Sequence, residues 1–404
     1  MDRKSIWEEN NLFEQIVSII KNIYIYFIRL QNKINTKKHN KIVFLLSFPS
    51  TSCYVLDSLY NEFKNDLIIC YTSNGRNLAE YYQKKGCTIY SLNFFSLLVN
   101  RVVSITKSSS IVLCDNYFAF LGAVEFDSET EVVQLWHANG AIKSFGLSAS
   151  YAKKSNKKNQ ERYLNVYRKF TRYIISSENM KKIFEKNYRQ NISILPFGYP
   201  PTDIYFDKKW LSESEKKFNE IFSPHKKILL YAPTYRERNS NNPIIFSELK
   251  KQLGEDWEIV VKLHPHDEML GDYLAKEKSI TTDLKGMSVQ ELLPFVDCLV
   301  TDYSSLPFEY SLAKSNAKMV FFCYDFDQYN LDVGIEPEFK NWMPGEIVYT
   351  QSEMVDAIFN DNHMNDGVAF NKEWNGYVDG ESRRKLVEWV KLKNGNRENN
   401  RYSD

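Results

Sequence analysis

The chain has 404 residues, of which 43% are hydrophobic and 25% charged, and its formal net charge at pH 7 is only +1. This length is too great for one ordinary hydrophobic core and suits two domains with appendages. The composition is that of a folded globular protein, and the near-zero charge provides no global field for nucleic acid, so we expect no nucleic-acid partner.

Residues 1–39 are predicted to form an amphipathic helix followed by a basic linker, with no transmembrane span. An apolar face followed by lysines suits a helix lying on an anionic membrane surface. A helix docked on the protein's own surface explains the same periodicity, so both interpretations stay open. A signal peptide fits less well, because acidic residues precede and interrupt the apolar run. The residues assigned to the membrane are Phe13, Ile16, Ile20, Phe27, Lys33, Lys37 and Lys38.

Short apolar runs alternate with longer segments over residues 40–200, which we assign to a first α/β domain. Such alternation indicates parallel strands joined by crossover helices. A proline-rich stretch, residues 196–207, is predicted to be a rigid link to the second half of the chain. The strands are expected at residues 42–46, 67–71, 87–92, 111–114, 132–136 and 173–176.

The alternation restarts over residues 208–393, which are assigned to a second α/β domain, and the polar tail 394–404 is expected to fray. Helices are expected at residues 288–295 and 306–313. The predicted fold class is therefore α/β, with two Rossmann-like domains facing a cleft, as in GT-B transferases, and an N-terminal amphipathic helix. The strands of the second domain are expected at residues 227–232, 257–263, 298–301, 319–324 and 347–350.

Two histidines follow predicted strands, one in each half of the chain. His137 follows the strand at 132–136, and His264 follows the strand at 257–263. Open α/β sheets place active sites at the carboxyl ends of their strands, and a histidine acts as a general base near neutral pH. A single histidine there is more often a hydrogen-bonded structural residue, but matching positions in both halves favour a shared catalytic site.

The loop after His137 contains small and basic residues. Asn139 and Gly140 let the backbone turn sharply and approach a ligand, and Lys143 adds positive charge. These three residues are assigned to the side of the cleft formed by the first domain. A strand–loop–helix joint with an incidental lysine is the structural alternative.

The second half carries groups suited to binding a nucleotide diphosphate. Arg236 and Lys262 lie at strand ends and would neutralise phosphates, and Ser304 and Ser305 lie where a strand passes into a helix, a ready phosphate site. Glu309, one turn further, is expected to accept hydrogen bonds from ribose hydroxyls. Simple helix capping by the serines is the competing interpretation. The full donor-binding set is Arg236, Lys262, Thr301, Asp302, Ser304, Ser305 and Glu309.

No metal site or cofactor is expected. Asp325 and Asp327 resemble a two-aspartate metal clip, but no third ligand is evident, and we interpret them as part of a turn. The six scattered cysteines indicate reduced thiols. Neither a P-loop nor a dinucleotide fingerprint is present.

Four segments, 134–143, 231–237, 262–265 and 301–309, resemble in order those of the CDP-glycerol glycerophosphotransferase family of wall teichoic acid synthesis. Within that family the likeness is closest to the glycerol-phosphate primases, through Asp115-Asn116-Tyr117 and the segments 143–147 and 304–307. The similarity runs from about residue 40 to about residue 350.

The resemblance implies a GT-B-like fold, CDP-glycerol as donor, an undecaprenyl-diphosphate-linked disaccharide as acceptor, and peripheral attachment to the cytoplasmic face of the cell membrane. The first domain would then face the acceptor and the second would bind the donor. Alternatives are a glycerol- or ribitol-phosphate polymerase of teichoic acid or capsule, a GT-B nucleotide-sugar glycosyltransferase, and a non-catalytic membrane scaffold that recognises phosphoglycans through the basic stretch 153–172.

Overall fold

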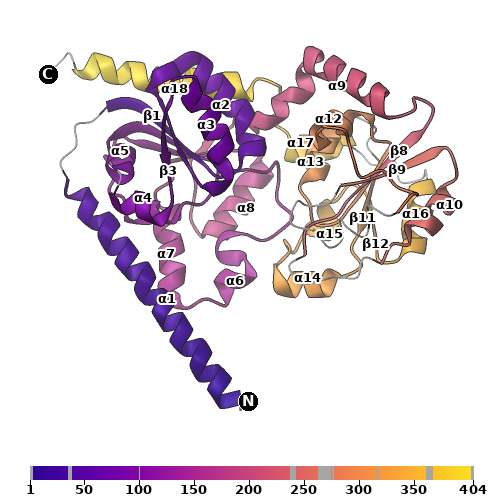
Figure 1. Ribbon diagram of the computed structural model, residues 1–404, viewed down its shortest axis with the longest axis horizontal. Coiled ribbons are helices and arrows are strands. Elements are labelled where there is room, and N and C mark those ends of the chain that lie inside the picture. The colour runs from indigo at the N-terminus through magenta and orange to yellow at the C-terminus, as the bar shows by residue number, and fades with distance from the viewer. Residues whose placement is uncertain are drawn as a thin grey trace.

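The computed structural model describes residues 3–34, 39–99, 101–236, 243–262, 274, 277–314, 316, 318–360 and 367–401, and the side chains of all of these except 3–16, 94, 98, 99 and 396–401. Within these ranges the chain forms two parallel β-sheets of seven and five strands, each flanked by helices (Figure 1). The predicted α/β class with parallel sheets is therefore confirmed.

The first sheet has the strand order β3-β2-β1-β4-β5-β6-β7 and is parallel throughout. Its central strands are continuous apolar runs, because helices cover both faces of the sheet and bury the side chains on each side. The sequence predicted six of the strands and missed β7, which has only two residues. The strands are β1 (His39–Leu46), β2 (Leu67–Tyr71), β3 (Thr88–Ser91), β4 (Ser109–Cys114), β5 (Glu131–Gln134), β6 (Arg172–Ile174) and β7 (Ile194–Leu195).

The second sheet has the order β12-β11-β10-β8-β9 and is also parallel. All five predicted strands are present: two have the predicted ends, and the ends of the other three differ by at most two residues. The predicted helix at 288–295 is α12 (Val289–Leu292) continued by the 3-10 helix η6 (Leu293–Phe295), and it begins with a capping box between Ser288 and Glu291. The strands are β8 (Lys227–Ala232), β9 (Trp257–Val261), β10 (Cys298–Thr301), β11 (Lys318–Phe322) and β12 (Glu346–Val348).

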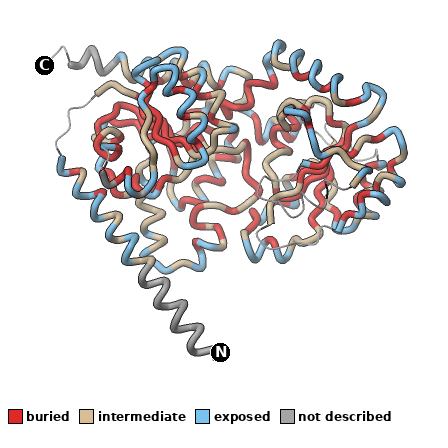
Figure 2. The backbone as a smooth tube through the Cα atoms, in the orientation of Figure 1, coloured by how far each residue is buried: buried red, intermediate tan, exposed pale blue. Residues whose placement is uncertain are grey.

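Helices cover both faces of each sheet, and the buried strands form the centre of each half (Figure 2). In the first half they are α2 (Pro49–Phe63), α3 (Arg76–Lys84), α4 (Phe94–Val99), α5 (Val102–Ser108), α6 (Ser150–Lys153), α7 (Lys157–Tyr167) and α8 (Glu178–Tyr188). The second half adds α9 (Lys208–Ile221), α10 (Phe246–Leu253), α13 (Leu306–Ala313), α14 (Phe326–Asp332), α15 (Phe339–Trp342), α16 (Gln351–Phe359) and α17 (Gly367–Trp374).

The hydrophobic core is continuous from one sheet to the other. Alternate residues of β1 point to opposite faces, so that Val43 belongs to a cluster that also contains Ile228 of β8 and Phe308 of α13, whereas Phe44 packs under α2 and α3. The link predicted at 196–207 contains the 3-10 helix η5 (Pro200–Phe206), which is mostly buried. The two sheets are thus joined by packed side chains as well as by the covalent link.

The last helix, α18 (Ser382–Arg401), crosses back to the first sheet, where it lies beside α2 (Figure 1). Leu386 and Val390 are fully buried in the core of the first half. Asn394 accepts a hydrogen bond from Ser110 Oγ at 2.6 Å and donates one to the Asn40 carbonyl at 3.2 Å. The predicted division at 393 was therefore wrong at its end, because the apolar face of α18 is completed by the first sheet and the helix continues through most of the predicted tail.

The N-terminal helix α1 (Arg3–Asn32) runs beside α7 (Figure 1). One face is docked: Ile28 is fully buried, Asn32 Nδ2 donates to the Ala123 carbonyl at 2.7 Å, and Arg162 of α7 donates to Asn22 Oδ1 at 2.7 Å. Among the described residues no helix is long and apolar enough to cross a membrane. The opposite face exposes apolar side chains at Ile19, Ile20, Ile23, Tyr26, Phe27 and Leu30, and Ile34, just after the helix, is also exposed.

Candidate active site

His137 lies just after β5, at the carboxyl end of the first sheet, as predicted. Its Nδ1 lies 3.0 Å from the main-chain oxygen of Asp115, and its ring stacks on that of Phe48 with centroids 3.8 Å apart and planes 7° apart. Burial lowers the pKa of His137 to about 4, so the imidazole is neutral at pH 7. Because a carbonyl oxygen only accepts hydrogen bonds, Nδ1 carries the proton and Nε2 keeps its lone pair.

Asp115 organises the strand end next to His137. Its carboxylate is buried and accepts hydrogen bonds from the backbone N–H groups of Ser47 and Phe48, both at 2.8 Å, and from Ser52 Oγ at 2.9 Å. Burial raises the pKa of Asp115 to about 6, against the effect of these donors. From the sequence, Asp115 was noted only for the family resemblance and was not predicted to be a site residue. Its position directly after a buried strand could have identified it as a candidate.

The backbone at His137 is held in an uncommon conformation. Trp136 has a φ of +63°, which is rare for a bulky residue and costs of order 1–3 kcal/mol. The Gln134 side chain supports this turn, since its Oε1 accepts from the Trp136 N–H at 2.9 Å and its Nε2 donates to the Asn116 carbonyl at 3.2 Å. The polar residue that ends β5 thus fixes the direction in which the chain leaves the sheet.

Asn139 and Gly140 pack against the second half of the chain. Asn139 is fully buried, and its Nδ2 donates to Asn375 Oδ1 at 2.8 Å. Gly140 has a φ of +80°, and a Cβ there would lie 2.5 Å from the Phe308 ring. The predicted contact of these two residues with an acceptor therefore does not fit this structure, in which they join the His137 loop to α13 and to the end of α17.

Lys143 lies where the two halves meet. Its main chain forms an antiparallel bridge with Ile335, and the neighbouring Ser144 N–H donates to the Gly334 carbonyl at 3.0 Å. Burial lowers the pKa of Lys143, the charge of Asp302 raises it, and the charge of Arg236 lowers it further. Among the described residues its ammonium has no hydrogen-bond or ion-pair partner, so it is a half-buried cation between His137 and the charged groups of the second sheet.

Arg236 follows β8 and is held between two carboxylates. Its Nε donates to Asp325 Oδ2 at 2.7 Å, and its Nη2 donates to Asp302 Oδ2 at 2.8 Å and to Asp325 Oδ1 at 3.0 Å. The guanidinium also lies 4.5 Å from the centroid of the Tyr329 ring. Burial by itself lowers the pKa of Arg236, but the two carboxylates raise it above its usual range. We refer to Arg236, Asp302 and Asp325 as the arginine–aspartate cluster.

The arginine–aspartate cluster bears on two sequence-based interpretations. The guanidinium of Arg236, predicted to bind a diphosphate, is already occupied by protein carboxylates. Asp325 lies in a turn, as predicted, and its carboxylate is one of the partners of Arg236. Asp302 follows β10 and Asp325 follows β11, and β10 lies between β11 and β8 in the sheet. The pairing of β8 with β10, which are not consecutive strands in the chain, brings both aspartates to the arginine that follows β8.

The remaining predicted donor-binding residues fall into two groups. Thr301 is fully buried and its Oγ1 donates to the Ala232 carbonyl at 2.7 Å, whereas Lys262 has an exposed side chain. Ser304 and Ser305 precede α13 and are partly exposed, and Ser304 Oγ accepts from the Leu306 N–H at 3.2 Å. Of these four residues, Lys262, Ser304 and Ser305 have side chains that reach solvent.

Glu309 is buried rather than open to a ribose. Its Oε2 accepts a hydrogen bond from the Tyr205 hydroxyl of η5 at 3.1 Å, and burial raises its pKa to about 7. Tyr205 belongs to the link between the halves, so this bond ties α13 to that link. The predicted contact with a ribose does not fit this conformation.

His264 lies outside the described residues, as do Lys37 and Lys38; Phe13 and Ile16 are described in their backbone only. Within the described part of the chain, no group of three or more histidine, cysteine or acidic residues is placed to hold a metal ion.

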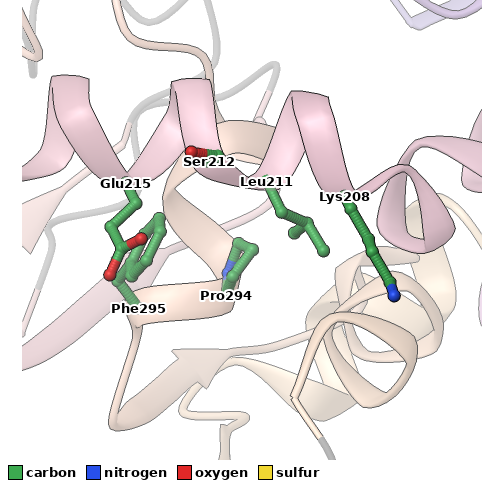
Figure 3. Close-up of a pocket in the computed structure, with 6 residues that line it drawn as sticks. All are labelled: Lys208, Leu211, Ser212, Glu215, Pro294 and Phe295. Carbon is green, nitrogen blue, oxygen red and sulfur yellow. The ribbon is translucent and has the colours of Figure 1, made fainter.

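A pocket of about 340 Å³ lies between α9 and η6, lined by Lys208, Leu211, Ser212, Glu215, Pro294 and Phe295 (Figure 3). It contains none of the predicted site residues.

Solved structures share this architecture. The wall teichoic acid polymerase TagF superposes with a TM-score of 0.71 at 18% sequence identity, covering 98% of this chain and 99% of that chain. A UDP-GlcNAc 2-epimerase from Neisseria meningitidis superposes with a TM-score of 0.57 at 13% identity, covering 87% of this chain and 99% of that chain. The chain therefore belongs to the same fold class as these structures, an α/β protein with two parallel sheets.

The chain belongs to the CDP-Glycerol:Poly(glycerophosphate) glycerophosphotransferase family, whose model matches residues 31–392. It is 29% identical over 388 residues to the teichoic acid glycerol-phosphate primase of Bacillus subtilis, covering 93% of this chain and 98% of the relative. The teichoic acid glycerol-phosphate primase of Staphylococcus aureus is 25% identical over 378 residues, covering 92% of this chain and 98% of the relative. A poly(ribitol-phosphate) polymerase of Bacillus spizizenii is 27% identical over 70% of this chain but only 46% of its own length. The family resemblance inferred from the motifs is confirmed.

Proposed function

We propose that this protein transfers glycerol phosphate from CDP-glycerol to an undecaprenyl-diphosphate-linked disaccharide and releases CMP, in wall teichoic acid synthesis. The observation that carries the proposal is the meeting of His137, Lys143 and the arginine–aspartate cluster at the junction of the two sheets. A neutral imidazole beside a half-buried cation suits the attack of a hydroxyl on a phosphorus atom.

The reaction would be an in-line displacement at the glycerol-bearing phosphorus. An acceptor hydroxyl oxygen forms the new P–O bond, its proton passes to Nε2 of His137, and the bond to the CMP phosphate breaks. Such phosphoryl transfer depends mainly on positioning and charge stabilisation. His264 would assist at the donor phosphates, as the sequence predicts.

The occupied state of Arg236 changes the expected donor contacts. One arginine and two aspartates carry a formal excess of negative charge, so the cluster as it stands does not attract a diphosphate. Lys143, Lys262 and the N-terminus of α13 at Ser304 and Ser305 are the described groups left to supply positive potential. Arg236 would then support the site through its ion pairs with Asp302 and Asp325 rather than bind the donor phosphates.

The full-length match to glycerol-phosphate primases supports addition of a single unit, whereas the polymerase match covers less than half of that relative. A ribitol-phosphate primase of Bacillus spizizenii is 26% identical over 93% of this chain and 97% of its own length, which makes a CDP-ribitol donor the second candidate. We would measure CMP release from each donor with and without a lipid-linked N-acetylmannosamine–N-acetylglucosamine acceptor. Acceptor-dependent release from CDP-glycerol with one unit added supports the proposal, and release from CDP-ribitol alone contradicts it.

The exposed apolar stripe of α1, which comprises Ile19, Ile20, Ile23, Tyr26, Phe27 and Leu30, supports peripheral attachment to an anionic membrane, and the exposed Ile34 follows directly after the helix. Apolar residues spaced along one side of a docked helix bury well in the headgroup region, and Lys33 adds positive charge. The paired substitution Ile23→Asp with Leu30→Asp should abolish flotation with phosphatidylglycerol vesicles. Val368→Asp, at a residue 76% exposed on α17, is the matched control and should float normally. Equal flotation of both proteins would exclude the α1 stripe as the anchor.

A further inference from the structure

Asp115 connects three neighbouring strand ends around His137. It follows β4, which lies between β1 and β5 in the first sheet. On the β1 side, its carboxylate accepts from Ser47 N–H, Phe48 N–H and Ser52 Oγ at 2.8–2.9 Å. On the β5 side, its main-chain carbonyl accepts from Nδ1 of His137 at 3.0 Å. One residue thus contacts both the support of the histidine ring and the ring itself.

The two contacts fix two different properties of His137. The carbonyl selects the Nδ1-protonated tautomer, which leaves Nε2 as the basic nitrogen. The carboxylate holds the start of α2, and with it the Phe48 ring that lies parallel to the imidazole at 3.8 Å. Since the N–H groups at a helix N-terminus favour a negative charge, this contact also stabilises the ionised carboxylate.

We propose that Asp115 is a positioning residue for His137: its carboxylate locks the 47–52 turn and its own backbone so that the carbonyl keeps His137 in the Nδ1-protonated tautomer. The use of Nε2 as the base in glycerol-phosphate transfer rests on the proposed function, but the tautomer does not. The competing view is that the carboxylate only anchors α2, in which case its loss lowers stability without changing the state of His137.

The test uses the full chain with ¹⁵N-labelled histidine, and a His137→Asn variant identifies the His137 signals. At pH 7.5 the wild-type protein should show a neutral ring with the proton on Nδ1. Asp115→Asn should convert this to a mixture of tautomers and move the pH midpoint of the ring toward that of an ordinary histidine, because an amide cannot accept from all the donors that the carboxylate serves. In the CMP-release assay, kcat should fall roughly 10- to 100-fold, part of a full acid–base contribution, with KM for CDP-glycerol unchanged.

Asp203→Asn is the matched control, because Asp203 is equally buried and accepts from the backbone N–H groups of Ser382 and Arg383. It should leave the His137 signals unchanged. Ser52→Ala removes one contact to the carboxylate and should shift the tautomer balance in the same direction as Asp115→Asn, which decides the matter if the latter does not fold. A wild-type ring protonated on Nε2, or a folded variant with unchanged signals, overturns the proposal. Absence of CMP release from wild-type protein with the expected tautomer would instead reject the proposed function and leave this inference intact.

Discussion

The polar groups at the strand ends of the two sheets are stabilised in different ways. Around His137, one carboxylate is satisfied by N–H and O–H donors, and the imidazole itself is neutral. The arginine–aspartate cluster instead consists of three full charges, of which Asp302 and Arg236 have side chains only 2% and 10% exposed. The first arrangement depends on hydrogen-bond geometry and the second on charge balance.

This difference separates two tasks. A neutral ring with one protonated nitrogen can accept a proton at once, without first losing a charged partner. A buried arginine held by two carboxylates resists displacement, because removal of one partner leaves buried charge uncompensated. We therefore expect His137, at the end of the first sheet, to accept the proton, and the arginine–aspartate cluster to stabilise the strand ends of the second sheet.

Removal of the arginine should have the largest effect on stability. Arg236→Met leaves Asp302 and Asp325 facing each other without a cation, and the free energy of unfolding in urea should fall by about 3–5 kcal/mol. Adding Asp325→Asn should recover part of the loss. Arg384 on α18 also pairs with two carboxylates, but at an exposed site, so Arg384→Met should change little. If Arg236→Met and Arg384→Met lowered the free energy of unfolding equally, the burial of the arginine–aspartate cluster would not make its ion pairs stronger than exposed ones.

Removal of the imidazole should stop the reaction without unfolding the protein. His137→Ala is expected to lower CMP release at least about 100-fold, given typical acid–base contributions. The exposed His225 offers a control, and His225→Ala should retain normal turnover. Near-normal turnover of a folded His137→Ala protein would refute the assignment of the base.

His264 extends this prediction to the second half. His264→Ala should also cost at least about 100-fold in rate, because the sequence places it at a matching strand end. Steady-state kinetics with CDP-glycerol would show whether the loss falls on kcat, as expected for a group acting on the leaving phosphate. A change confined to KM would restrict His264 to donor binding.

The buried carboxyl of Glu309 makes stability depend on pH. Burial raises its folded-state pKa to about 7, above the ordinary value, so the folded protein binds this proton more tightly than the unfolded chain. The contribution is therefore most favourable at low pH, and stability is lost as the pH rises toward 7. Glu309→Gln, which still accepts from Tyr205, should raise the Tm at pH 8 more than at pH 5.5. An equal change at both pH values would contradict a raised pKa.

The sequence predicted the strands well because their signal is local. Buried parallel strands are short apolar runs, and the runs at 227–232 and 298–301 coincide with β8 and β10. The strand-end rule likewise placed His137 and Arg236 correctly at the carboxyl edge. The two-residue β7 and the return of α18 to the first sheet have no such local signal, since both depend on partners distant in the chain.

The side-chain contacts were harder to predict than the positions. Asn139 and Glu309 lie where the sequence placed them, yet each is buried against a distant segment, the end of α17 and η5 respectively. Asp325 was recognised as following a strand, but its pairing with Arg236 depends on which strands are neighbours. Chain order does not give that adjacency, so roles assigned by strand-end position alone remained incomplete.

The smallest predicted effect tests whether the charges near the arginine–aspartate cluster influence the protonation of His137. Lys143 lies between them, and its positive charge lowers the pKa of His137, after the larger effect of burial. Lys143→Gln should therefore raise the midpoint of the His137 ring in a ¹⁵N-detected titration, by less than about one unit, or roughly 1 kcal/mol. Lys153→Gln on the exposed side of α6 is the control and should leave the midpoint in place. An unmoved midpoint in both variants would mean that the histidine is insulated from the charges of the second sheet, and that bound donor, rather than the protein, must couple the two.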